Sequence, residues 1–497
     1  MANCKDKYKE LIINSWGWLL CCFIISTLFV LFFSYSTSPL YKDFYGYDSA
    51  CYITFGKMWY SGKIPYVEFF DHKGPWIFFV NMLGFLISGG SKYGICFLQI
   101  IFMTASLAGV YNISQLFEDN RKYAVLITVI TILLMKINYI NGDTVEEFCM
   151  PFINWSVYGL VKYYKNESEE KSHPYGWAIL YGITIGICSL SRLTNIAQII
   201  GLIFVVFMTL ILGKNFKNLI QNLVAGVVGI LAVWVPFSVY FAYHKAFGEF
   251  IYGTFTHNYL YTETLTNWFP SWGSNGVITF INSYIAYYCI WGIVLVTYVN
   301  KRYGMCIAFA ITGLLEAYVF NLGDLYNQYP FICMVNIPIF LGMLKKWTEK
   351  EDYFKFLVAV LSVVWIGHYF IANIIPSTSS AVDMRFYREQ HIARDYESVI
   401  ASIPADELDS FVAYGGYKID DVYMVTNTIP DYKYCLFEQW FSQASDKVTT
   451  EIREEYGTLK AKWIMTEGNY DTVRDILEAN YEVYNQNDTG YTMWRRK

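Results

Sequence analysis

Residues 65–87 read PYVEFFDHKGPWIFFVNMLGFLI, a charged turn followed by a short apolar run. The apolar run, Trp76–Ile87, has 12 residues, whereas a helix that crosses a bilayer needs roughly 20. We therefore interpret it as an interfacial or re-entrant helix. This choice decides the topology of the chain, because one additional crossing here would invert the orientation of every later loop.

The composition of the chain indicates a membrane protein. Of its 497 residues, 55% are hydrophobic and 16% are charged, whereas soluble domains carry about 25% charged residues. We predict a mainly α-helical, polytopic protein of about 11 transmembrane helices. The apolar runs that approach spanning length lie at 15–35, 94–117, 122–140, 147–164, 176–191, 194–213, 217–243, 276–299, 303–322, 328–345 and 354–374.

Lysine and arginine determine the predicted orientation, since short cytoplasmic loops are enriched in both. With a cytoplasmic N-terminus, every basic loop lies inside, and residues 36–93 form a long first external loop. The polar residues 376–497 are then external as well, and their helical and strand-like patterns predict a small α/β domain. We expect two domains, a transmembrane catalytic domain over 1–375 and an extracytoplasmic domain over 376–497.

Composition excludes one functional class, and the cysteines form no zinc motif. The net charge is −5 and no basic stripe is present, so we expect no nucleic-acid partner. Most of the eleven cysteines lie in apolar runs, where they behave as small hydrophobic residues. No Cys and His pair has the spacing of zinc ligands.

The first external loop concentrates ionisable groups in an otherwise apolar chain. Asp48, Glu68, Asp71, His72 and Lys73 fall within it. Charged groups beside an apolar helix are costly and are usually retained for function. The structural alternatives are that Asp48 caps a helix starting at Ser49, and that residues 71–73 form a solvated turn.

A second set of charges opens later spans on the same predicted face. Asp143, Glu146 and Glu147 precede the fourth span, and Arg192 lies in a short turn. The acids could be favoured simply by the helix dipole, and the arginine could extend toward the interface. Because all these charges fall on the external side, we expect a shared cavity there.

Acids and a phosphate-binding cation at the outer membrane face suit one chemistry in particular. A sugar could be moved from a lipid-phosphate carrier to a hydroxyl group. A carboxylate would take the proton of the attacking hydroxyl. Cations, or a metal held by further carboxylates, would offset the charge on the leaving phosphate.

The charged motifs carry a resemblance to a known family. The chain resembles bacterial membrane glycosyltransferases of the GT-C superfamily, in the branch of protein O-mannosyltransferases and lipid A aminoarabinose transferases. The motifs are Tyr47-Asp48, Gly62-Lys-Ile-Pro-Tyr66, Asp71-His-Lys-Gly-Pro75 and Gly142-Asp-Thr-Val-Glu-Glu147.

The resemblance implies a role for each charged residue. It implies a polyprenyl-phosphate sugar donor, a hexosyl or pentosyl transfer, and inversion at the anomeric carbon. The implied roles are catalytic base for Asp48, donor-phosphate binding for Lys73, His72 and Arg192, and orientation of the acceptor or a metal for Asp71, Asp143, Glu146 and Glu147.

The resemblance also implies the setting of the reaction. The enzyme would act at the outer face of the bacterial cytoplasmic membrane, in cell-envelope or polysaccharide biosynthesis, on a glycan, lipid or protein acceptor. Many relatives carry Glu after the first Asp, where this chain has Ser49. A divalent cation (Mg, Mn or Zn) therefore stays open, with Asp48, Asp143 and Glu146 as its candidate ligands.

Two other functions are compatible with parts of the sequence. A transporter or flippase of lipid-linked sugars predicts charges near the bilayer midplane on broken helices, often in two related halves. Here the charges lie on predicted external loops, and no halves repeat. A polymerase or ligase of surface polysaccharide would use similar chemistry with a larger acceptor.

Overall fold

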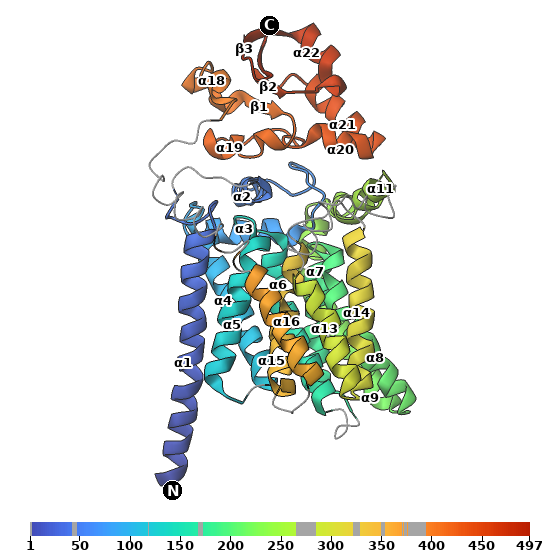
Figure 1. The fold of residues 1–497 in the computed structure, drawn as a ribbon. Helices are drawn as coiled ribbons and strands as arrows, with labels where there is room; N and C mark the ends of the chain where they lie inside the picture. Colours follow the sequence, from blue (N-terminus) through green and yellow to red (C-terminus); the bar gives the residue numbers. More distant parts are fainter. Residues whose placement is uncertain are drawn as a thin grey trace. The chain divides into compact units, whose positions relative to one another are not determined.

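The computed structural model confirms a mainly helical protein with a small sheet in its C-terminal part (Figure 1). The chain forms two compact units. We call the first the bundle unit (residues 1–34, 97–235 and 267–385) and the second the mixed unit (residues 35–96, 236–266 and 386–497). The structure describes residues 2–41, 47–117, 119–166, 172–264, 285–321, 329–348, 353–369, 371, 375 and 394–497.

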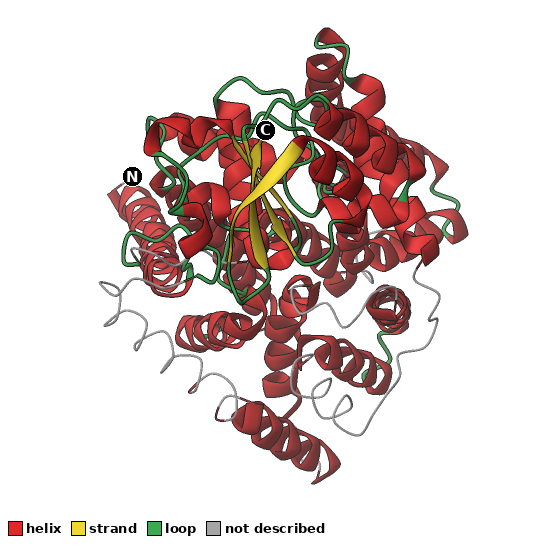
Figure 2. Ribbon diagram, turned by 90° about the horizontal axis from the view of Figure 1, so that it is seen from above, coloured by secondary structure: helices red, strands yellow, loops and turns green. Residues whose placement is uncertain are grey.

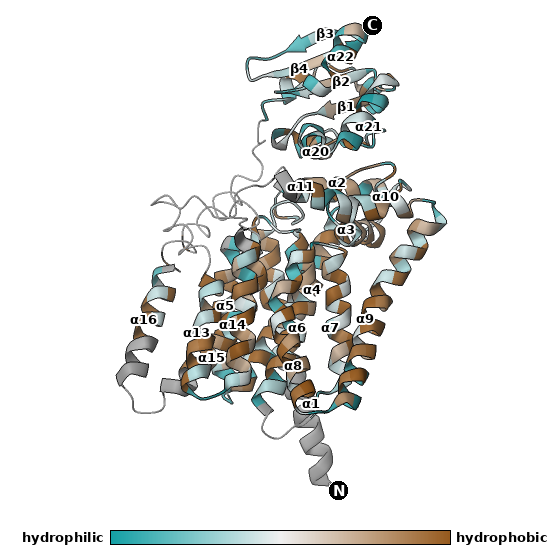
Figure 3. Cartoon of the chain, turned by 90° about the vertical axis from the view of Figure 1, so that its right-hand side faces the viewer, coloured by the Kyte–Doolittle hydropathy of each residue, from teal (hydrophilic) through white to brown (hydrophobic). Residues whose placement is uncertain are grey.

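Long apolar helices make up the bundle unit, and Figure 3 shows hydrophobic residues along most of them. Within the described residues, a helix corresponds to each of the eleven predicted spans. Four segments, Trp16–Phe33, Tyr93–Phe117, Leu193–Leu212 and Phe216–Tyr243, are long and apolar enough to cross a membrane. The bundle helices are α1 (Ala2–Phe33), α4 (Tyr93–Phe117), α5 (Arg121–Tyr139), α6 (Val145–Asn166), α7 (Tyr175–Ser189), α8 (Ala197–Leu212), α9 (Phe216–Tyr243), α13 (Ile285–Val299), α14 (Tyr303–Asn321), α15 (Asn336–Thr348) and α16 (Tyr353–Tyr369).

Small residues allow two of these helices to approach closely. A Cβ atom added to Gly182 of α7 would lie 2.0 Å from the carbonyl oxygen of Gly226 in α9. A Cβ atom on Gly229 would lie 2.1 Å from the carbonyl oxygen of Ile179. Such backbone contact between small residues is the usual way in which membrane helices gain packing energy.

The N-terminal part of the mixed unit is built on a pair of helices. Helix α2 (Tyr47–Tyr60) packs against α3 (Pro75–Ile87), and a Cβ atom on Gly56 would lie 2.4 Å from that of Asn81. Helix α3 begins with Gly74 as N-cap and proline at its first position, where proline's fixed φ and missing N–H are tolerated. Its thirteen residues confirm the short helix that the sequence predicts.

The C-terminal part of the mixed unit contains a four-stranded sheet, whose strands are seen in yellow in Figure 2. The strand order is β1-β2-β4-β3, with β1 parallel to β2 and the other pairs antiparallel. Its strands are β1 (Phe411–Tyr414), β2 (Trp463–Glu467), β3 (Tyr481–Gln486) and β4 (Tyr491–Arg496). The remaining helices of the mixed unit are α10 (Phe247–Ile251), a π-helix (Tyr252–Thr256), α11 (His257–Thr264), α18 (Glu397–Ile400), α19 (Val422–Val425), α20 (Glu438–Ala444), α21 (Asp446–Gly457) and α22 (Arg474–Asn480).

The small α/β domain predicted for the tail agrees with this sheet and its helices. The compact units nevertheless cut across a division into residues 1–375 and 376–497. Residues 35–96 and 236–266 group with the C-terminal residues, so the predicted first external loop belongs to the same unit as the tail.

Candidate functional site

The turn at Asp71–Lys73 is a buried arrangement of three ionisable side chains in the mixed unit. Asp71 Oδ1 accepts a hydrogen bond from the backbone N–H of Lys73 at 2.7 Å and lies 3.4 Å from His72 Nδ1. Lys73 Nζ lies 2.5 Å from His72 Nε2. Because an ammonium group can only donate, Nε2 accepts and the imidazole is neutral, with its proton on Nδ1 facing Asp71.

Burial rules out the alternative of a solvated turn. Asp71 is 4% exposed and Lys73 is 8% exposed. Tyr66, which has a φ of 66°, donates from its hydroxyl to the carbonyl oxygen of Lys73 at 2.8 Å. Asn258 Nδ2 of α11 donates to the carbonyl oxygen of His72 at 2.5 Å. The turn is therefore fixed both by contacts among its own side chains and by hydrogen bonds to its backbone carbonyl groups.

Asp48 lies in the first turn of α2. The helix begins at Tyr47, so Asp48 is not the N-cap of a helix that starts at Ser49, and that alternative is wrong. An acid in the first turn is favoured by the helix dipole. Burial, with the nearby charges of Asp421 and Asp48, raises the pKa of Asp420 to about 8. At neutral pH a largely neutral Asp420 therefore adds little negative charge near Asp48.

Glu147 organises the acidic loop of the bundle unit. Its Oε2 accepts from the backbone N–H of Asp143 at 2.9 Å and from Gln99 Nε2 at 2.8 Å, and its Oε1 accepts from the Tyr139 hydroxyl at 2.8 Å. All four residues from Ile140 to Asp143 have positive φ, between 37° and 78°. Left-handed backbone is costly for residues other than glycine, so the carboxylate stabilises a strained turn.

Glu146 and Arg192 form a buried ion pair in the same unit. Arg192 Nη1 lies 2.5 Å from Glu146 Oε1, and the Glu146 side chain has no exposed surface. The other oxygen of Glu146 has no hydrogen-bond partner among the residues that the structure describes. Arg192 is held by this pair, so the alternative of an arginine that simply extends toward the interface is not supported.

Several buried polar residues of the bundle unit lie outside the sequence motifs. Gln99 and Tyr139 bind Glu147, and Asn195 is fully buried one helical turn after Arg192. Glu316 of α14 is also fully buried. The available signal was a polar residue inside an apolar run, since Glu316 is the one acid in residues 303–322.

The predicted site residues thus fall into two groups, one in each unit. Asp48, Asp71, His72 and Lys73 belong to the mixed unit, and Asp143, Glu146, Glu147 and Arg192 belong to the bundle unit. Among the described residues, no three His, Cys, Asp or Glu side chains are grouped as metal ligands.

Comparison with known proteins gives two matches of different kinds. Residues 72–240 match the family model described as dolichyl-phosphate-mannose-protein mannosyltransferase. This segment includes Lys73, the acids at 143–147 and Arg192, but not Asp48. A search of curated proteins gave no match.

The structure is similar to ArnT from Cupriavidus metallidurans over nearly the full length of both chains. The apo form of ArnT is 13% identical, with 97% of this chain and 98% of that chain covered and a TM-score of 0.56. The form bound to undecaprenyl phosphate is 13% identical, with 96% and 98% covered and a TM-score of 0.53. The chain thus shares the fold of ArnT, and its residues 72–240 match the mannosyltransferase family model.

Proposed function

We propose that this protein is a membrane glycosyltransferase that moves a sugar from a polyprenyl-phosphate donor to a hydroxyl acceptor. The observation that carries the proposal is the buried ammonium group of Lys73, placed by His72 within the segment that matches the mannosyltransferase family. The similarity to a fold that binds undecaprenyl phosphate in ArnT supports the donor class.

Lys73 is suited to hold the donor phosphate. Its hydrogen bond to a neutral imidazole leaves the positive charge in place, with further N–H groups available as donors. A charge-assisted hydrogen bond to a phosphate oxygen is stronger than a neutral one. Arg192, fixed by Glu146, would supply a planar second cation, which suits the geometry of a phosphate.

Asp48 would act as the catalytic base. Its carboxylate takes the proton from the acceptor hydroxyl while the hydroxyl oxygen forms a bond to the anomeric carbon of the sugar. The bond between that carbon and the phosphate oxygen breaks, and the electron pair leaves with polyprenyl phosphate. Lys73 and Arg192 stabilise the charge that develops there.

The remaining acids would position these groups. Asp71 orients His72, Glu146 orients Arg192, and Glu147 holds the turn that carries Asp143. Asp143 would orient the acceptor.

The basic loops support a reaction at the outer face of the cytoplasmic membrane, with a cytoplasmic N-terminus. The sugar would be a hexose or a pentose, and the acceptor a glycan, a lipid or a protein. A transporter is less well supported, because the family model that matches residues 72–240 is that of a mannosyltransferase.

Binding of undecaprenyl phosphate to the purified full-length protein tests the donor class. Lys73→Ala should weaken binding of this lipid about tenfold, since a hydrogen bond to a charged group contributes about 1.5–3 kcal/mol. Binding of undecaprenol, which lacks the phosphate, should not change. Lys460→Ala, on the C-terminal part of the chain, is the matched control. Equal affinity of the wild type and Lys73→Ala for undecaprenyl phosphate would remove Lys73 from the phosphate site.

A further inference from the structure

The Asp71–Lys73 turn packs against α20, an element from the C-terminal part of the chain. The His72 ring lies 4.9 Å from the Trp440 ring, with an angle of 69° between the planes, and 5.7 Å from the Phe441 ring. Phe70, just before the turn, lies 5.2 Å from the same Phe441 ring. Edge-to-face contacts of this kind favour a defined ring orientation.

The orientation of the His72 ring controls the position of the Lys73 ammonium group. The ring can accept from Lys73 at Nε2 and present Nδ1 to Asp71 only in one orientation. A ring that turned away would leave the flexible lysine side chain without this partner. The contact between the His72 ring and Trp440 therefore helps to position the Lys73 ammonium group.

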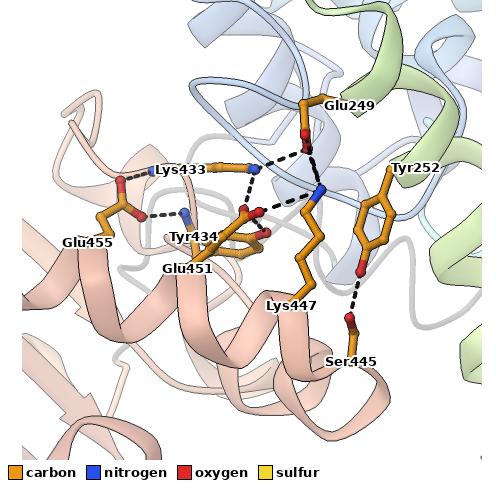
Figure 4. A network of polar contacts seen from close by, with 8 residues as sticks. All are labelled: Glu249, Tyr252, Lys433, Tyr434, Ser445, Lys447, Glu451 and Glu455. Atoms are coloured by element: carbon orange, nitrogen blue, oxygen red, sulfur yellow. Dashed lines mark hydrogen bonds and ion pairs between the residues drawn. The ribbon is translucent and has the colours of Figure 1, made fainter.

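A polar network fastens this C-terminal region to α10 and the π-helix (Figure 4). Lys447 Nζ lies 3.0 Å from Glu249 Oε2, and Lys433 Nζ lies 2.6 Å from Glu451 Oε2. Lys433 and Glu249 are 3.5 Å apart. Lys447 also lies 3.9 Å from the centre of the Tyr252 ring. Exposed pairs contribute little singly, but charges joined in a network contribute more.

The backbone of the Asp71–Lys73 turn is held both by the C-terminal region and by the segment that contains the π-helix and α11. The N–H of Phe70 donates to the carbonyl oxygen of Lys433 at 2.9 Å. Asn258 of α11, the helix that directly follows the π-helix, donates to the carbonyl oxygen of His72. The Tyr252 and Ser445 hydroxyls are 2.6 Å apart and form a further link between the π-helix and the C-terminal region.

We propose that Trp440 is a positioning residue for the donor phosphate. It holds the His72 ring in the orientation that fixes Lys73, and so makes the C-terminal part of the chain a component of the donor site. The inference rests on the proposed role of Lys73 in phosphate binding.

Two substitutions of Trp440 test the inference in the purified full-length protein. Trp440→Leu keeps an apolar side chain and removes the ring, so affinity for undecaprenyl phosphate should fall about fivefold, the order expected for a lost aromatic contact. Trp440→Phe keeps a ring and should bind within about twofold of the wild type. Binding of undecaprenol should not change in either variant. Arg453→Ala, which removes an exposed ion pair of the same domain, is the control.

The outcomes distinguish this inference from the proposal on which it rests. An equal loss of affinity for undecaprenyl phosphate and undecaprenol in Trp440→Leu would show a general structural role and overturn the inference. Unchanged phosphate binding in Trp440→Leu, with weakened binding in Lys73→Ala, would overturn the inference alone. Unchanged binding in Lys73→Ala would overturn the phosphate role of Lys73 and, with it, the role of Trp440.

Discussion

Replacement of Glu147 by alanine should unfold the acidic loop of the bundle unit. The substitution removes the acceptor of three buried donors, which are the Gln99 amide, the Tyr139 hydroxyl and the backbone N–H of Asp143. A buried donor that loses its partner costs about 1–3 kcal/mol. Relaxation of the loop recovers part of this, so we expect a loss of about 3 kcal/mol in the free energy of unfolding.

Replacement of Glu147 by glutamine separates hydrogen bonding from charge. The amide oxygen can take the place of Oε2 and accept from Gln99 and Asp143. The amide NH₂ group then faces Tyr139, whose hydroxyl can turn to accept instead of donating. We therefore expect Glu147→Gln to lose less than about 1 kcal/mol, because no buried donor is left without a partner.

Unfolding of the two variants in mixed detergent micelles measures this difference. The expected order of stability is wild type, then Glu147→Gln, then Glu147→Ala. Equal stability of Glu147→Ala and wild type would refute the reasoning about the turn. A Glu147→Gln variant as unstable as Glu147→Ala would show that the negative charge, not hydrogen bonding, is required.

Two further predictions concern the pH dependence of stability and the strained turn. The folded protein raises the pKa of Asp420 to about 8, so the folded state holds a proton that the unfolded state releases near pH 4. The wild type should therefore lose stability relative to Asp420→Asn as the pH rises from about 4 to 8, by at most about 1.4 kcal/mol per pH unit. A stability difference independent of pH would contradict this. Gly142→Ala should cost about 2 kcal/mol or more, since Gly142 has a φ of 78° and a Cβ atom would lie 2.4 Å from Ser34 Oγ. Gly176→Ala, where a Cβ atom meets no atom within 4 Å, should be nearly neutral in the same unfolding measurement.

Local patterns in the sequence predicted most of the fold. The apolar run at 94–117 became α4 at Tyr93–Phe117, and the strand-like patterns within residues 376–497 became a four-stranded sheet. The short run after Pro75 is a helix of thirteen residues, α3, and its interfacial or re-entrant placement stays a prediction. These elements are set by hydrophobic period, length and capping residues, which are all visible within a few turns of chain.

The partners of the site residues could not be predicted in the same way. Glu147 meets Gln99, and His72 meets Trp440, across long stretches of chain that leave no pattern of spacing. Each of these contacts depends on how whole helices pack. The sequence therefore identified the charged residues but not what holds them, and it missed Glu316, which is marked only by being a lone acid in an apolar run.

Sugar release from a polyprenyl-phosphate donor by Asp48→Asn tests the central proposal most directly. An amide cannot accept the proton of the acceptor hydroxyl, so the variant should stay folded in the membrane and lose transfer of the sugar, while binding undecaprenyl phosphate as the wild type does. Asp475→Asn, an exposed acid of the C-terminal part, should retain wild-type transfer. Wild-type turnover by Asp48→Asn would contradict the assignment of Asp48 as the base of a glycosyl transfer.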